Sequence, residues 1–260
     1  MKDFDKIVAA NCYFEIVYPD IDKVDETKYR EIRQNWIGAS DSSKLLNLNP
    51  FPKSTCDDLI TEKVTGEYNE EIGRKASVRM GKDIEEVILK KVQEFFGKDD
   101  YYVDKPKDMY GDPESGLGIN FDSIAVYSDF VAFPIEIKAV TKYGRKYYDF
   151  SKSNHYQKDG EWQPTRETDI YTHIPANHYV ELAKELGIPL YYYTQLQQQM
   201  MAVNASIGFL AAMDVDNWDL HLFKIPKNEC LWTDLKLRGK EATLKIRTIR
   251  KLKEAKATEE

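Results

Sequence analysis

The pattern Glu-x-Lys, which places an acid and a base one residue apart, occurs three times in this chain. The copies are Glu26-Thr27-Lys28, Glu136-Ile137-Lys138 and Glu254-Ala255-Lys256. Only the middle copy lies inside an apolar stretch with the alternation of a strand, DFVAFPIEIKAV at 129–140. Because side chains alternate across a strand, Glu136 and Lys138 point to one face and Ile137 to the other. The sequence therefore predicts a carboxylate and an ammonium side by side.

Asp122 lies on the preceding predicted strand, GLGINFDSIAVY at 116–127, and a turn-like YSD joins the two strands into a hairpin. Pairing of these strands brings the Asp122 carboxylate close to that of Glu136. Two converging carboxylates suit Mg²⁺, which prefers oxygen ligands, and we expect Mn²⁺ to substitute. The metal would activate a water against a phosphate, and Lys138 would stabilise the developing charge or orient the water. A surface ion pair is the alternative that the strand pattern alone leaves open.

A helix predicted over 76–97 contributes a further acid. Its apolar residues recur at helical spacing and Gly97 ends it. Glu85 shares its side of the helix with Ile88 and Leu89, whereas Glu86 shares its side with polar residues. The spacing thus turns Glu85 toward the edge of the core. A carboxylate held there needs a metal or a lysine as partner.

The remaining pattern predicts alternating helices and strands in one α/β domain over residues 1–260, with a small mixed sheet flanked by helices. We expect strands at 11–19, 206–214 and 220–226, and helices at 40–48, 54–66, 174–187 and 188–205. Ser40 or Asp41 would cap the first of these helices, and Gly66 would end the second. Residues 141–174 show no clear period, and we expect an irregular insertion there.

Composition is that of a globular protein, with 42% hydrophobic residues over 260 positions. No stretch approaches the length of a membrane span and the amino terminus lacks the layout of a signal peptide, so we expect a cytoplasmic protein. Its three cysteines, Cys12, Cys56 and Cys230, are too few and too widely separated for a disulfide framework or a metal knuckle. We expect them to be reduced.

Charge is segregated along the chain. The net charge of −7 argues against a nucleic-acid partner when it is averaged over the whole sequence. Residues 235–256, however, hold nine lysines and arginines against two glutamates, within a basic C-terminal extension at about 227–260. This extension is either a solvated tail or a DNA-contacting segment, and composition favours neither.

Five short motifs in order resemble the phage-type recombination exonucleases, the YqaJ-like and lambda-exonuclease group of the PD-(D/E)xK nuclease superfamily. They are Ile37-Gly38-Ala39-Ser40-Asp41, Met80-Gly81 with Glu85, Asn120-Phe121-Asp122, Glu136-Ile137-Lys138 and Tyr192-Tyr193-Thr194-Gln195-Leu196-Gln197. The resemblance implies a restriction-endonuclease-like fold. It also implies metal ligation by Glu85, Asp122, Glu136 and the Ile137 carbonyl, assistance from Lys138, and Gln195 in the active centre.

The same resemblance implies a pocket for a 5′-phosphate, with Arg33 and Ser40 as its residues. Asp112 matches an additional acid of the family, although a turn residue explains it as well, and Tyr192 and Gln197 are further candidates. The activity implied is a Mg²⁺-dependent 5′-to-3′ exonuclease on double-stranded DNA ends that leaves 3′ overhangs for a single-strand annealing recombinase. Relatives imply a homotrimer encoded by a bacteriophage and acting in bacteria.

Two other functions are compatible with parts of this pattern. An endonuclease of the same fold would use the same centre without a free end, and a non-catalytic DNA-binding subunit would have lost it. The four histidines show no metal-ligand spacing. Tyr191, Tyr192 and Tyr193 would stack on bases or belong to the core.

Overall fold

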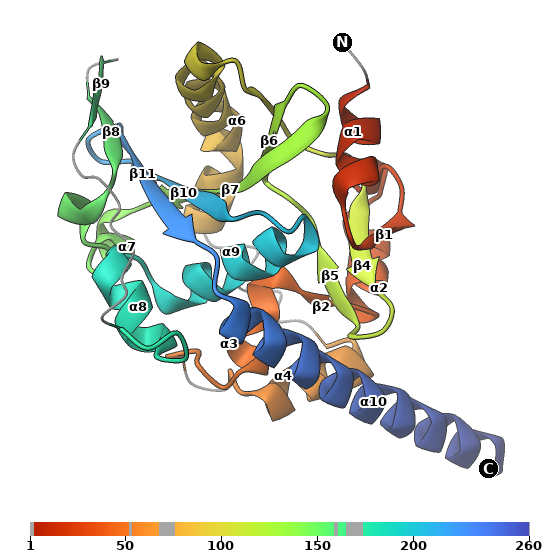
Figure 1. The fold of residues 1–260 in the computed structure, drawn as a ribbon. Coiled ribbons are helices and arrows are strands. Elements are labelled where there is room, and N and C mark those ends of the chain that lie inside the picture. The colour runs from red at the N-terminus through yellow and green to blue at the C-terminus, as the bar shows by residue number, and fades with distance from the viewer. Residues whose placement is uncertain (1–2, 52–53, 68–75, 159–160, 165–173, 260) are drawn as a thin grey trace.

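A seven-stranded mixed sheet forms the centre of the computed structural model, which describes residues 3–51, 54–67, 76–158, 161–164 and 174–259. The strands follow one another across the sheet as β3 (Tyr102–Asp104), β6 (Ser123–Tyr127), β7 (Phe130–Val140), β10 (Ile207–Asp214), β11 (Asp219–Pro226), β8 (His155–Lys158) and β9 (Glu161–Pro164). β7 and β10 are parallel and the other neighbours antiparallel (Figure 1). The predicted mixed sheet is confirmed.

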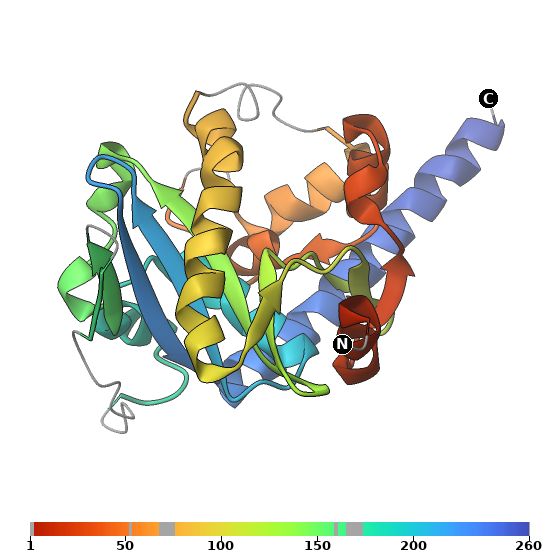
Figure 2. The ribbon, with the colours of Figure 1, turned by 90° about the horizontal axis from the view of Figure 1, so that it is seen from above.

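Helices cover both faces of this sheet. α6 (Ala76–Phe96) lies along one face, where its Ile88 and Val92 pack with Ile135 and Ile137 of β7 (Figure 2). α9 (Leu190–Ala202) packs on the other face through Leu196 and neighbouring apolar residues. Burial of one strand face under each helix follows the period of two along β7 and β10. The alternation therefore sends Glu136 and Lys138 toward the α9 side.

A second sheet of four strands lies beside the first. Its order is β1 (Glu15–Tyr18), β4 (Met109–Asp112), β5 (Leu117–Ile119) and β2 (Ile37–Gly38). The single strand predicted over 116–127 is wrong, because β5 pairs in the second sheet and β6 in the first. Residues 120–122 link the two sheets. Buried residues continue from β5 through Phe121 into β6, so the pattern gives no sign of the change of sheet.

Residues 141–174 are more regular than expected. They include α7 (Lys142–Arg145), and β8 and β9 form a hairpin that extends the sheet beyond β11. The prediction of an irregular insertion is wrong for this hairpin, since an edge hairpin with few buried residues has no strong apolar alternation. Residues 165–173 of the segment lie outside the described residues.

The other helices position the site from outside the sheets. They are α1 (Phe4–Asn11), α2 (Glu26–Gln34), the 3-10 turn η2 (Ala39–Asp41), α3 (Ser42–Leu45), α4 (Cys56–Thr65), α8 (Tyr179–Leu186) and α10 (Glu229–Glu259). Gly66 ends α4 with a φ of 72°, as predicted, and α10 lies wholly within the basic extension. In the part of the chain that the structure describes, no helix is long and apolar enough to cross a membrane. All three cysteines are free thiols.

Candidate active site

Three oxygen atoms contact the ammonium group of Lys138. Its Nζ lies 3.1 Å from Asp122 Oδ2 and 2.8 Å from the Ile137 carbonyl oxygen, and it is paired directly with Glu136 Oε1. The Ile137 backbone amide also donates to Asp122 Oδ2, at 3.0 Å. Asp122 stands next to Ser123, which pairs with Ile135 and so brings its neighbour opposite Glu136. The predicted convergence of the two carboxylates is present in the structure.

Glu136 is fully buried, and α9 contacts both of its carboxylate oxygens. Gln195 Nε2 donates to Oε1, and Gln199 Nε2 donates to Oε2 at 2.6 Å. Burial, followed by repulsion from the Asp122 carboxylate, raises the pKa of Glu136 above its usual range, against the opposing effect of Lys138. Further positive charge near this buried carboxylate would stabilise its ionised form.

Tyr192 completes the surroundings of the ammonium. The Lys138 Nζ lies 5.4 Å from the centre of the Tyr192 ring, in the range of a cation–π contact. Burial by itself would lower the pKa of Lys138, but attraction to Asp122 and Glu136 outweighs it and raises that pKa. The lysine therefore keeps its proton at neutral pH and acts as a fixed positive charge.

The donor atoms around Lys138 fit a divalent metal. Asp122 Oδ2, Glu136 Oε1 and the Ile137 carbonyl oxygen all contact the Lys138 ammonium. They are the hard oxygen ligands that Mg²⁺ and Mn²⁺ prefer. Among the described residues, no three acidic, histidine or cysteine side chains lie close enough to form a site by themselves. The set that fits a metal therefore comprises two carboxylates and one carbonyl.

Glu85 lies at the margin of this centre. It is half-buried whereas Glu86 is exposed, in agreement with the helix-face argument. Its Oε1 is 3.9 Å from Lys105 Nζ, an ion-pair partner that the sequence reasoning did not identify. Burial and then the charge on Asp122 raise the pKa of the Glu85 carboxyl. Among the described residues, Lys105 is the ion-pair partner of Glu85, and no hydrogen bond or ion pair joins Glu85 to Lys138.

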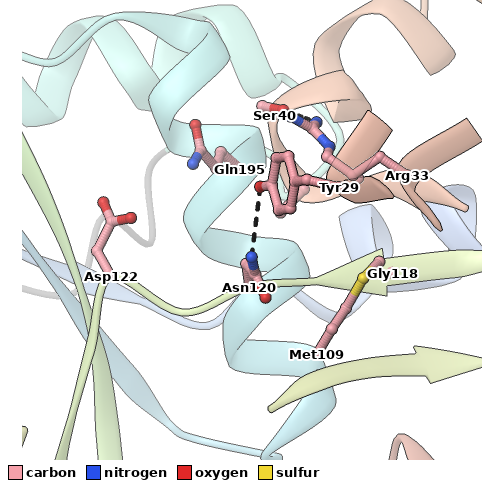
Figure 3. A pocket seen from close by; sticks show the side chains of 10 residues that line it. Tyr29, Arg33, Ser40, Met109, Gly118, Asn120, Asp122 and Gln195 are labelled. Atoms are coloured by element: carbon pink, nitrogen blue, oxygen red, sulfur yellow. Dashed lines mark hydrogen bonds between the residues drawn. The ribbon is translucent and has the colours of Figure 1, made fainter. Parts of the chain in front are cut away.

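A cavity of about 180 Å³ is lined both by two of the predicted catalytic residues and by the residues of the predicted phosphate pocket (Figure 3). Arg33 and Ser40 line one side of it and Asp122 and Gln195 the other. Arg33 Nη2 donates to Ser40 Oγ at 2.9 Å. Gly38 also lines the cavity, and a Cβ atom there would lie 2.8 Å from Arg33 Nη2. Glycine at this position therefore leaves room for the Arg33 guanidinium.

A buried ion pair supports the Arg33 side of the cavity. Lys63 Nζ lies 3.0 Å from Asp41 Oδ2 and donates to the Arg33 carbonyl, also at 3.0 Å. The same Asp41 oxygen accepts from the Gly38 backbone amide at 3.1 Å. These contacts replace the expected helix cap, because the Asp41 side chain does not cap α3 and Ser40 lies inside η2. Neither side chain forms the predicted cap of this helix, although Asp41 occupies the N-cap position of α3 and its carboxylate accepts from the Gly38 amide at the start of η2, as in a capping box.

Glutamines on α9 connect the two halves of the site. Gln198 is buried, accepts from Ser42 Oγ at 2.6 Å and donates to the Ile37 carbonyl at 3.2 Å and to the Gly118 carbonyl at 3.1 Å. It therefore joins β2, α3 and β5 to the helix that carries Gln195. One helix, α9, therefore contacts both the acidic centre and the segments around the predicted phosphate pocket.

Gln197 does not belong to the centre. Its side chain donates to the Pro226 carbonyl at 2.7 Å and accepts from the Asn228 backbone amide and from Trp232 Nε1, both at 2.9 Å. Residues two apart on a helix point in different directions, so Gln195 and Gln197 cannot share a site. Gln197 fixes the start of α10 instead, and its proposed place among the site residues is wrong.

Asp112 occupies a turn. Its carboxylate accepts from Ser115 Oγ at 2.6 Å and from the Glu114 backbone amide at 3.1 Å, between β4 and β5. This is the turn alternative, and no contact joins Asp112 to the described residues of the centre. Sequence reasoning missed Gln199, although its position four residues after Gln195 on a predicted helix is a signal for it. Tyr29, which lines the cavity from α2, carried no such signal.

Comparison with known proteins gives this arrangement a family. The YqaJ-like viral recombinase domain matches residues 28–206, well over half of the chain. A search of curated proteins gives no match. Crystal structures of an alkaline exonuclease from Laribacter hongkongensis, one of them in complex with dAMP, are similar with a TM-score of 0.56 and 15% identity, over 90% of this chain and 98% of that one. The predicted PD-(D/E)xK-type fold is confirmed by this likeness. The chain belongs to the family of YqaJ-like viral recombinase domains.

Proposed function

We propose that this protein is a metal-dependent exonuclease that degrades one strand of double-stranded DNA from its 5′ end. Hydrolysis of successive phosphodiester bonds would leave a 3′ single-stranded overhang. The observation that carries the proposal is the single cavity with Arg33 and Ser40 at one side and Asp122 and Gln195 at the other. A pocket for a terminal phosphate next to a hydrolytic centre selects DNA ends over internal sites.

The acidic centre supplies the groups that hydrolysis needs. Asp122, Glu136 and the Ile137 carbonyl would hold Mg²⁺, or Mn²⁺ in its place, with Glu85 as a further carboxylate close by. When bound, the metal lowers the pKa of a water and offsets negative charge on the phosphate under attack. Lys138 adds a permanent positive charge beside that phosphate. Gln195 and Gln199 keep the buried Glu136 carboxylate oriented.

The proposed 5′-to-3′ direction of degradation rests on the phosphate pocket. Arg33 offers a planar guanidinium and Ser40 a hydroxyl, both suited to a phosphate oxygen. A 5′-terminal phosphate bound there would present a nearby phosphodiester to Asp122. The overhang produced would serve a single-strand annealing recombinase in the cytoplasm of a phage-infected bacterium. A homotrimer around the duplex, as in relatives, belongs to the same proposal.

Digestion of matched DNA substrates tests the proposal. Linear duplex with 5′-phosphates and a covalently closed circle are incubated with the protein in Mg²⁺, in Mn²⁺ and in EDTA. We expect the linear DNA to release nucleotides from its 5′ strand only, the circle to stay intact, and EDTA to stop the reaction. Lys138→Ala should slow release by about 10²–10³-fold, as loss of one charge-stabilising group does.

Each alternative has its own outcome. Cutting of the circle identifies an endonuclease with the same centre. Release from neither DNA in either metal, with duplex binding retained, identifies a non-catalytic binding subunit. Digestion by Lys138→Ala at the parent rate contradicts the assignment of the centre.

A further inference from the structure

The last residues of α10 form an arm that extends beyond the body of the protein (Figures 1 and 2). Before the arm, α10 packs on the body through Leu231, Leu235, Ala242 and Ile246. Residues 251–258, which we call the arm, are all exposed. Its basic side chains are Lys251, Lys253 and Lys256.

The arm belongs to the basic part of an otherwise acidic chain. Residues 235–256 carry nine basic and two acidic side chains, a formal charge of +7, so the other residues together carry −14. Favourable interaction of lysines with a helix dipole is confined to the last turn, whereas this stretch covers about six turns. The charge is therefore larger than the helix end requires, and it complements a polyanion.

Arg250 fixes the base of the arm next to the phosphate pocket. Its guanidinium donates to Asn35 Oδ1 at 2.8 Å and to the Gln34 carbonyl at 3.0 Å, both at the end of α2, and to the Lys63 carbonyl at 2.6 Å. α2 also carries Arg33, which lines the cavity. Because Arg33 and Gln34 are adjacent, the arm starts next to the end of the helix that lines the cavity.

We propose that the arm binds the phosphate backbone of duplex DNA beside the pocket and so increases the affinity for DNA ends. This inference rests on the proposed DNA substrate. Lysines on an exposed helix neutralise phosphates without reading bases, and each neutralised phosphate releases counterions. The alternative occupant of this surface is a second copy of the chain, because Leu244 and Leu252 of α10 are exposed. The test below distinguishes the two.

Salt dependence of binding measures the contribution of the arm. Fluorescence anisotropy follows binding of a blunt duplex of about three helical turns, in EDTA so that no cleavage occurs, over a series of salt concentrations. The arm variant is Lys251→Gln/Lys253→Gln/Lys256→Gln. The control is Lys146→Gln/Lys158→Gln/Lys184→Gln, three exposed lysines near α7, β8 and α8 at the opposite side of Figure 1.

We expect the arm variant to bind more weakly and its slope of log affinity against log salt to fall by about 2 to 3, since each phosphate contact contributes about 0.9. The control should keep the wild-type slope, and light scattering should give all three proteins the same mass. An unchanged slope in the arm variant overturns the inference. A smaller mass for the arm variant also overturns it, because the occupant is then a second copy.

Failure of this inference differs from failure of the proposed function. A wild-type protein that digests linear DNA, together with an unchanged slope in the arm variant, removes the inference and leaves the exonuclease. A wild-type protein without nuclease activity whose slope still depends on the arm removes the exonuclease and leaves the DNA contact.

Discussion

Gln199 donates a 2.6 Å hydrogen bond to Oε2 of the buried Glu136, one helical turn beyond the glutamine that holds the other oxygen. Residues four apart on a helix share a face, so α9 can donate hydrogen bonds to both oxygens of this carboxylate. The oxygen that faces Lys138 therefore has a fixed position. Hydrogen bonds of this kind commonly orient the carboxylates that bind metals, the role proposed for Glu136.

Gln199→Ala should reduce nuclease activity by about 10–100-fold, because it frees one oxygen of the carboxylate proposed to hold the metal. The matched control is Gln197→Ala on the same helix, whose amide contacts the start of α10 instead. Both variants lose buried hydrogen bonds, and each should lower the free energy of unfolding by about 1–3 kcal/mol. Activity is measured under conditions in which both variants are folded. An equal loss of activity in the control contradicts a positioning role for Gln199.

The positions of the residues in the acidic centre could be predicted from the sequence more readily than the structure around the proposed phosphate pocket. Strand alternation placed Glu136 and Lys138 on one face, and helical spacing separated Glu85 from Glu86, because both arguments use local periods. The Lys63–Asp41 pair under the pocket joins α4 to η2, a contact that no local period specifies. The same limit applies to the hairpin of β8 and β9, whose place at the sheet edge depends on pairing with β11.

Lys138→Met should strengthen the stabilising effect of Mn²⁺. In the wild-type protein the ammonium already neutralises the Asp122 and Glu136 carboxylates, so a metal competes with it for the same oxygens. In the methionine variant the two carboxylates repel each other until a metal binds. A ligand that binds only the folded state raises its stability in proportion to RT ln(1 + [L]/Kd), so the melting temperature should rise more on addition of Mn²⁺ than in wild type.

Asp122→Asn is the control for the metal experiment, and it should show a smaller shift than wild type because it removes a charged ligand. Differential scanning calorimetry with and without Mn²⁺ measures all three shifts. A Lys138→Met protein that Mn²⁺ does not stabilise contradicts a metal site at these oxygens.

Arg33→Gln should remove the preference for a 5′-phosphate. A charge-assisted hydrogen bond contributes about 1.5–3 kcal/mol, equivalent to roughly 10–100-fold in rate or affinity. We expect that factor between 5′-phosphorylated and 5′-hydroxyl duplexes in wild type, and a ratio near one in the variant. The control is Arg30→Gln, one turn earlier on α2, whose side chain pairs with Glu26. Loss of the preference in both variants contradicts a specific role for Arg33.

His221 should make stability fall at acid pH. The imidazole stacks on Phe150 at 4.2 Å and on Tyr156 at 5.5 Å, and burial lowers its pKa from 6.5 to about 4. The folded state therefore resists a proton that the unfolded chain accepts, so stability is complete above about pH 6.5 and is lost as the pH falls toward 4. The expected loss at about pH 5 is roughly 1–2 kcal/mol, with allowance for the exposed part of the ring.

His221→Phe keeps the aromatic stacking and removes the titrating group, so its unfolding free energy should decrease less between about pH 7.5 and about pH 5 than that of wild type. Urea unfolding of both proteins at the two pH values measures the difference. Other groups that titrate in this range contribute equally to both proteins, and their effect cancels in the comparison. Equal pH dependence in the two proteins means that His221 accepts its proton in the folded state as easily as in the unfolded chain.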